Sequence, residues 1–121
     1  MKSLVVLRAV AVAHAVAVCL QPVLAGVYLN GSGAALRLHE PIGLGLAFLS
    51  LGQLLAATIY WRSGGRGSAV LATLLLLAAE AVQISMGYTR QLAVHIPLGI
   101  TIVALVCAFA VWTFRPAARP S

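Results

Sequence analysis

Two histidines in this sequence occur in the same short pattern, His-x-Pro-[Ile/Leu]-Gly, at residues 39–43 and 95–99. Proline two residues after a histidine suits the first turn of a helix, so each histidine is predicted at or beside a helix start. The glycine four residues on shares the histidine's helix face and leaves it without a side chain. Haem needs this combination, because the imidazole reaches the iron and the flat macrocycle lies close to the backbone. We therefore expect His39 and His95 to ligate one haem b, with Gly43 and Gly99 beneath the ring.

Two other interpretations of these histidines stay open. Each ring could merely cap a helix start at the membrane interface, where amphipathic side chains are comfortable. A zinc or copper ion would need more ligands than two imidazoles, and Glu40 is predicted to point to a neighbouring face. Arg37 and Arg90 lie within a turn or two of the histidines. Because guanidinium groups suit carboxylates, we expect these arginines to meet the haem propionates.

A second set of polar residues lies inside apolar stretches. His14 falls about ten residues into the first stretch and Glu80 about twelve into the third, so their depths nearly match. A buried carboxylate is costly there, so Glu80 is expected to be protonated, paired with His14 or close to water. Gln21 follows His14 on its helix face and Gln83 follows Glu80, which extends a polar stripe toward the proposed haem. The stripe predicts either a proton path or quinone site, or a hydrogen-bonded pair that only ties two helices together.

Membrane helices must position these residues. A chain that is 62% hydrophobic and only 8% charged has too few polar side chains to cover a surface that faces water. Each of four apolar runs has about the 20 residues that cross a bilayer, at approximately 4–28, 39–61, 68–88 and 92–114. The separators are short and rich in turn residues, which makes neighbouring spans antiparallel. We predict an all-α membrane protein whose single domain is an antiparallel bundle of four transmembrane helices.

The charge distribution predicts how the bundle is oriented. Only Arg37 and Arg90 of the eight basic residues fall on one side of the membrane, so the positive-inside rule predicts that both termini are cytoplasmic. The basic residues stand singly, and the net charge of +6 therefore does not indicate nucleic-acid binding. The first apolar run is longer than a signal-peptide core and is expected to be retained. Cys19 and Cys107 lie in apolar runs, where a cysteine is usually a small buried hydrophobe.

The bundle is also predicted to consist of two repeated hairpins. Gln21 near the end of the first span has a looser counterpart in Gln83 near the end of the third. Because the first and third spans run in the same direction, a pseudo-twofold axis along the membrane normal would relate the hairpins. Such an axis sets His39 and His95 at equal depth on facing helices, where four-helix bundles commonly build cofactor sites.

Residues 21–43 and 80–99 carry a resemblance to known proteins. Gln21-Pro-Val-Leu-Ala-Gly26, followed by Leu38-His39 and Gly43, resembles an uncharacterised family of small four-span bacterial membrane proteins. The architecture is also similar to one half of haem A synthase, whose four-helix halves each carry a histidine opening their second and fourth helices. The resemblance implies that His39 and His95 ligate haem. Haem A synthase also uses an acidic residue in an outward loop, and residues 30–38 here contain none. The resemblance therefore implies binding or electron transfer without synthase activity.

The expected function is electron transfer by a haem-b bundle near the extracytoplasmic face, as a carrier or binding subunit more than a stand-alone enzyme. The expected partners are the lipid bilayer and a quinone or respiratory membrane protein, with assembly into an oligomer left open. Two alternatives remain, a structural or assembly subunit without a cofactor and a small proton-coupled exporter. Small multidrug exporters of similar size carry their glutamate in the first span, whereas Glu80 lies in the third.

Overall fold

The structure is a computed structural model that describes residues 1–119, and its regular elements are helices. These are α1 (Lys2–Leu29), α2 (Gly33–Arg62), α3 (Ser68–Tyr88), α4 (Leu92–Trp112) and a short 3₁₀ helix, η1 (Pro116–Ala118). Helices α1 to α4 are each long and apolar enough to cross a membrane. Large apolar side chains also cover the outside of the bundle, for example Val16, Phe48, Leu75 and Ile100. Because such all-round apolarity is typical of membrane spans, the predicted fold class is confirmed.

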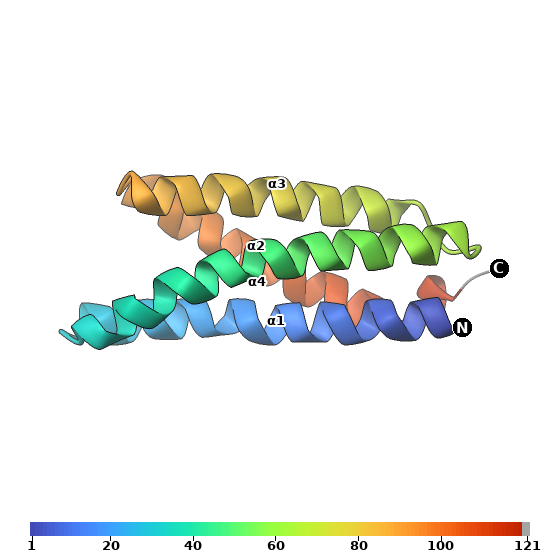
Figure 1. Cartoon of the computed structure of the whole chain (residues 1–121), viewed down its shortest axis with the longest axis horizontal. Coiled ribbons are helices and arrows are strands. Elements are labelled where there is room, and N and C mark those ends of the chain that lie inside the picture. Colours follow the sequence, from blue (N-terminus) through green and yellow to red (C-terminus); the bar gives the residue numbers. More distant parts are fainter. Residues whose placement is uncertain (120–121) are drawn as a thin grey trace.

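The helices form an antiparallel bundle in which α1 and α3 each contact both α2 and α4. Figure 1 shows both termini and the α2–α3 loop at one end of the bundle, which we call the termini end, and the two hairpin turns at the other, the far end. The far-end turns, 30–32 and 89–91, have the same length and the same pattern of backbone hydrogen bonds. Their middle residues, Gly31 and Arg90, both have a positive φ, of 98° and 56°. The two hairpins therefore repeat in structure as well as in sequence.

Helix α2 begins earlier than predicted, at Gly33 instead of His39. Residues 34–38 are Ala-Ala-Leu-Arg-Leu, all good helix formers, and they extend the helix back to its N-cap at Ser32. The prediction that His39 lies at a helix start is therefore wrong, whereas His95 lies in the first turn of α4 as predicted. Every other predicted boundary is within two residues of the observed one.

The earlier start of α2 places Pro41 inside the helix. Proline has no backbone N–H to donate to the carbonyl of Arg37, and its ring clashes with that carbonyl, so it kinks the helix. Figure 1 shows the first part of α2 slanting across the bundle before the helix straightens. The same view shows the two hairpin turns well apart at the far end.

Burial is uneven along the bundle, with the core concentrated toward the termini end. The buried residues nearest the far end are Val18 in α1, Leu46 in α2, Glu80 in α3 and Ile102 in α4, apart from one alanine. That alanine, Ala35, is the only buried residue beyond this level in the four helices. The far-end half is therefore loosely packed, and it contains both histidine motifs.

At the termini end, the segment after α4 is tied back onto the bundle. The fully buried Tyr60 donates from its hydroxyl to the backbone carbonyl of Ala118 at 2.8 Å. Arg8 donates from Nε to the carbonyl of Thr113 at 2.7 Å. The last carbonyls of a helix have no partner within the helix, so Arg8 supplies a donor where α4 ends. Arg8, one of the six basic residues on the side of the termini, thus also holds the C-terminal segment.

Cys19 in α1 and Cys107 in α4 are free thiols whose Sγ atoms lie 3.6 Å apart. Cys19 is exposed and Cys107 is half-buried, so the prediction that both are buried is wrong. In a span that is apolar on all sides, the sequence pattern does not tell which residues face lipid and which face other helices. The pair marks where α1 and α4 meet on the outer surface of the bundle.

The loop between α2 and α3 offers a test of packing at the termini end. A methyl group on Gly65 would overlap the ring of Tyr60, which is buried and cannot easily move aside. We expect Gly65→Ala to lower the free energy of unfolding by about 1–3 kcal/mol, measured by denaturant titration in mixed micelles. Gly52→Ala is the control, because a methyl group there meets nothing within 4 Å. Equal effects of the two substitutions would contradict this packing of Tyr60.

Candidate functional site

His39 and His95 face each other in the far-end half of the bundle. They come from α2 and α4, which lie diagonally because each of them packs between α1 and α3. The ring centroids are 6.2 Å apart and the ring planes are inclined by 65°. Both residues are half-buried. The structure therefore brings together the two histidines that the sequence predicted as a pair.

A hydrogen bond from α3 orients the ring of His95. Its Nδ1 lies 2.8 Å from the backbone carbonyl oxygen of Gln83. A carbonyl can only accept, so Nδ1 carries the proton, and Nε2 of the neutral ring keeps its lone pair. Histidines that bind metals are commonly held in this way, with the second nitrogen donating to a backbone carbonyl. The side-chain amide of Gln83 also approaches Nε2, at 3.4 Å.

The surroundings of His39 are different. Its ring lies beside the backbone of Gln21 in α1, as the ring of His95 lies beside Gln83 in α3. The buried Nδ1 atom of His39 makes no hydrogen bond of good geometry among residues 1–119, although the backbone of Gln21 is close enough to act on the ring. A buried ring nitrogen without a partner is unfavourable, and a ligand or a reoriented ring would relieve it.

The glycine faces expected to be bare are covered by glutamine side chains. A methyl group on Gly43 would lie 3.7 Å from Oε1 of Gln21, and one on Gly99 would lie 2.7 Å from Nε2 of Gln83. Each glutamine thus lies over the glycine of its own hairpin, as the predicted twofold relation requires. The sequence placed the glutamines on the stripe toward the site but did not predict that they would cover the glycines.

Gly87 is a site residue whose contact the sequence did not predict. A methyl group there would come within 3.0 Å of Cε1 of His95, so the ring packs directly on the backbone of α3. Gly87 is four residues after Gln83, which places both on the face of α3 that His95 contacts. That spacing is the signal from which the contact could have been predicted.

The separation of the two imidazoles suits a shared metal centre. Imidazole–metal bonds of about 2.0–2.1 Å, plus about 1 Å from each nitrogen to its ring centre, would place the centroids about 6 Å apart. The observed separation is 6.2 Å. Within residues 1–119 no three His, Cys, Asp or Glu side chains gather into a metal-binding group. A haem would bring four nitrogens of its own and need two imidazoles, whereas a bare zinc or copper ion would need further ligands from the protein.

The charged residues of the far end are all exposed. Arg37 and Arg90 are both exposed, the first in the second turn of α2 and the second in the α3–α4 turn. Glu40 accepts a hydrogen bond from the hydroxyl of Tyr88 at 2.8 Å, which links α2 to α3. The carboxylate of Glu40 therefore contacts α3. This agrees with the prediction that Glu40 lies on a helix face next to the face of His39.

His14 and Glu80 meet in the middle of the bundle, as their matched depths predicted. Nε2 of His14 lies 2.8 Å from Oε1 of Glu80, and Nδ1 lies 3.0 Å from Oε1 of Gln53. The relative exposures of His14, Gln53 and Glu80 are 0%, 0% and 3%. The sequence did not predict that Gln53 would be a partner of the pair. The cluster links α1, α2 and α3 at one level.

No family model, curated protein or solved structure matches this chain. The function is therefore argued from the site itself, in which two histidines face each other above a buried carboxyl–imidazole pair.

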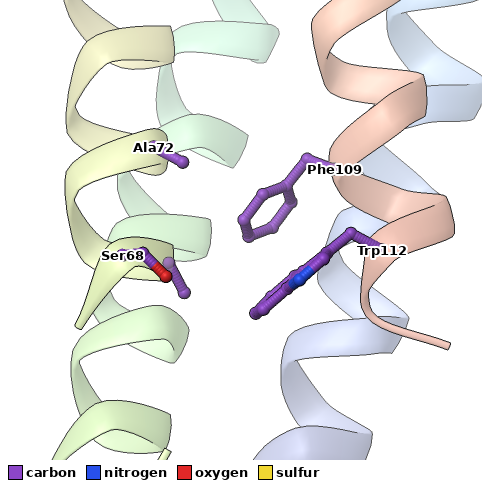
Figure 2. Close-up of a pocket in the computed structure, with 5 residues that line it drawn as sticks. Ser68, Ala72, Phe109 and Trp112 are labelled. Carbon is purple, nitrogen blue, oxygen red and sulfur yellow. The ribbon is translucent and has the colours of Figure 1, made fainter. Parts of the chain in front are cut away.

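A shallow hollow of about 200 Å³ lies between α3 and α4 at the termini end. Figure 2 shows Phe109 and Trp112 projecting from α4 toward α3, with Ser68 and Ala72 on the opposite wall. Its lining contains no charged side chain, so it offers no acid, base or anionic ligand. The residues that can carry chemistry are those of the far-end half and the buried cluster.

The strength of the His14–Glu80 contact is measurable by a double-mutant cycle of His14→Phe and Glu80→Leu. We expect a coupling of about 1–2 kcal/mol in the free energy of unfolding in micelles, the size of interhelical hydrogen bonds in membranes. The control cycle replaces Glu80 by Leu and Tyr88 by Phe, since Tyr88 contacts Glu40 instead. A coupling for the first cycle no larger than for the control would contradict the pairing.

Proposed function

We propose that this chain is a membrane haem-b protein in which His39 and His95 would hold the iron. The observation that carries the proposal is the approach of the two rings from diagonal helices, with centroids 6.2 Å apart. The hydrogen bond from His95 Nδ1 to the backbone carbonyl of Gln83 supports it, because it fixes the tautomer in which Nε2 keeps the lone pair that a metal needs. Gly87 supports it too, because the absence of a side chain lets His95 approach α3 closely.

The loose packing of the far-end half gives further support. Ala35 is the only buried residue there within the four helices, so this half lacks the apolar filling that the other half has. A macrocycle held between the histidines would supply it. The amide ends of Gln21 and Gln83 would have to turn aside, which is feasible because both side chains are flexible and half-buried. Arg37 and Arg90, exposed at the same end, would then pair with the propionates.

The role that follows is one-electron transfer. The bound haem would supply an iron that gains and loses one electron, and the protein would supply its two ligands and a low-dielectric surrounding. The resemblance of the sequence motifs to one half of haem A synthase implies the same ligation. Because residues 30–38 contain no acid, we propose a carrier or binding subunit that exchanges electrons with a quinone or a respiratory membrane protein.

A second candidate is a structural or assembly subunit without a cofactor. It is favoured by the contacts of His95, since Gln83 engages Nδ1 through its backbone and Nε2 through its amide. In that case the histidines only tie helices together at the far end. The haem experiment below separates the two candidates.

The test is the absorption spectrum of protein purified in detergent after expression with haem available. We expect a sharp α-band on reduction, because two strong imidazole ligands would give a low-spin iron, and we expect His39→Ala and His95→Ala each to abolish it. His14→Gln is the matched control, because His14 is the third of three histidines and lies in the buried cluster. A colourless wild-type protein, or a band that survives either alanine substitution, would favour the structural candidate.

We also propose that both termini are cytoplasmic and that the histidines lie near the outer face of a bacterial inner membrane. Six of the eight basic residues, including Lys2 and Arg66, belong to the termini end. A fluorescent protein fused to the C-terminus should therefore fold and fluoresce, and alkaline phosphatase fused there should be inactive. The same two reporters fused after Gly31, in the first far-end turn, should give the reverse. Phosphatase activity at the C-terminus would invert the proposed orientation.

A further inference from the structure

The contacts of His14 determine how many protons the buried pair holds. Oε1 of Gln53 is an acceptor 3.0 Å from Nδ1, so Nδ1 carries a proton and donates it. Nε2 and Oε1 of Glu80 are then 2.8 Å apart, a distance at which a nitrogen and an oxygen must share a proton. Charge separation into imidazolium and carboxylate is costly where both groups are buried. The favoured state is therefore a neutral carboxylic acid on Glu80 that donates to a neutral His14.

The cluster also contains polar atoms that the bundle leaves without partners. Oε2 of Glu80, Nε2 of Gln53 and Oγ of Ser50 are all buried and make no hydrogen bond within residues 1–119. Ser50 and Gln53 are one turn apart on α2, and both residues are fully buried. An arrangement that served only to tie helices would be expected to satisfy these atoms, since a buried polar group without a partner is unfavourable. The free polar atoms of Ser50 and Gln53 therefore lie in the same cluster as a carboxyl group whose second oxygen makes no hydrogen bond.

Helix α3 connects this carboxyl group to the histidine pair. Gln83 is three residues after Glu80, about 4.5 Å farther along the axis at 1.5 Å per residue. Its backbone carbonyl and side-chain amide both contact His95. In a medium of low dielectric constant, a charge that appears between the histidines acts strongly on a proton one or two turns away.

Few other groups can compete for that proton. From α1 the titratable group that faces Glu80 is His14, and from α2 the neutral Gln53 joins the cluster. The residues that α4 buries nearest this level are apolar, Ile102 and Val106. The second acidic residue of the chain, Glu40, is exposed at the far end and accepts a hydrogen bond from the hydroxyl of Tyr88.

We propose that Glu80 is a proton-binding site coupled to the redox state of the haem, an inference that rests on the proposed function. Loss of one electron from the site to a membrane quinone would be balanced by Glu80, whose O–H bond breaks. The proton leaves along the polar side chains toward water at the far end, and Glu80 remains as a carboxylate beside His14. Reduction reverses both transfers, so one electron and one proton enter together. The positive charge gained by the oxidised site stabilises the carboxylate that the proton leaves behind.

The first test needs no haem. Infrared spectra of the full chain in bilayers should contain a protonated-carboxyl stretching band that shifts in D₂O. Glu80→Gln should remove this band, and the matched substitution Glu40→Gln should leave it. Glutamine at position 80 keeps the size of the side chain and an N–H that can donate to His14, so the variant should fold. Absence of the band from the wild type would overturn the inference whether or not haem binds.

The second test is the pH dependence of the haem midpoint potential in the full-length protein. The reduced form binds the proton more tightly, so the potential should fall as pH rises, with a slope approaching about 59 mV per unit, the value for a tenfold change in a one-electron equilibrium. Glu80→Gln should flatten the slope, and Glu40→Gln should preserve it. A slope unchanged in Glu80→Gln, or abolished in Glu40→Gln, would overturn the inference while leaving haem binding intact. Failure of the proposed function would show earlier, as a protein without an α-band.

Discussion

The interior of a bilayer offers polar groups no water, so a polar side chain inside the bundle needs a partner on another helix. Glu80, His14 and Gln53 meet this condition together and link α3, α1 and α2 at one level. Helices held in a fixed register can bring small residues into close contact, and Ala11 and Ala57 are both fully buried. The buried cluster is thus the boundary between a well-packed half of the bundle and a looser half that holds the histidines.

In the looser half, most of the interior contacts described above are made within one hairpin. Each glutamine covers the glycine of its own hairpin, whereas the contact between His39 and His95 joins one hairpin to the other. A group held by both histidines would therefore do more than provide chemistry. It would close the interior at the end where the hairpins diverge, and part of its binding free energy would stabilise the fold, as for other sites that assemble around a metal.

The sequence predicted what composition and periodicity control: the spans, their antiparallel order, the depth of the His14–Glu80 pair and the facing histidines. It did not predict features that depend on how helices rotate against one another. The exposure of Cys19 is one such feature, because an apolar span has no polar face to indicate the lipid side. The glutamines over Gly43 and Gly99 are another, since flexible side chains settle only when the neighbouring helix is placed. The start of α2 was misjudged because Pro41 is favoured in a first turn but is tolerated, with a kink, inside a membrane helix.

The early start of α2 is nevertheless compatible with the repeat. Six residues of α2 precede His39 and three residues of α4 precede His95. On the other helix of each hairpin, eight residues follow Gln21 to the end of α1, and five follow Gln83 to the end of α3. Both helices of the first hairpin are thus longer by three residues, about 4.5 Å or nearly one turn, beyond the level of the site. An extension shared equally by the two helices moves the turn outward and leaves the pairing below it unchanged. The symmetry that relates the histidines therefore belongs to the interior of the bundle, while the hairpin tips are free to differ in height.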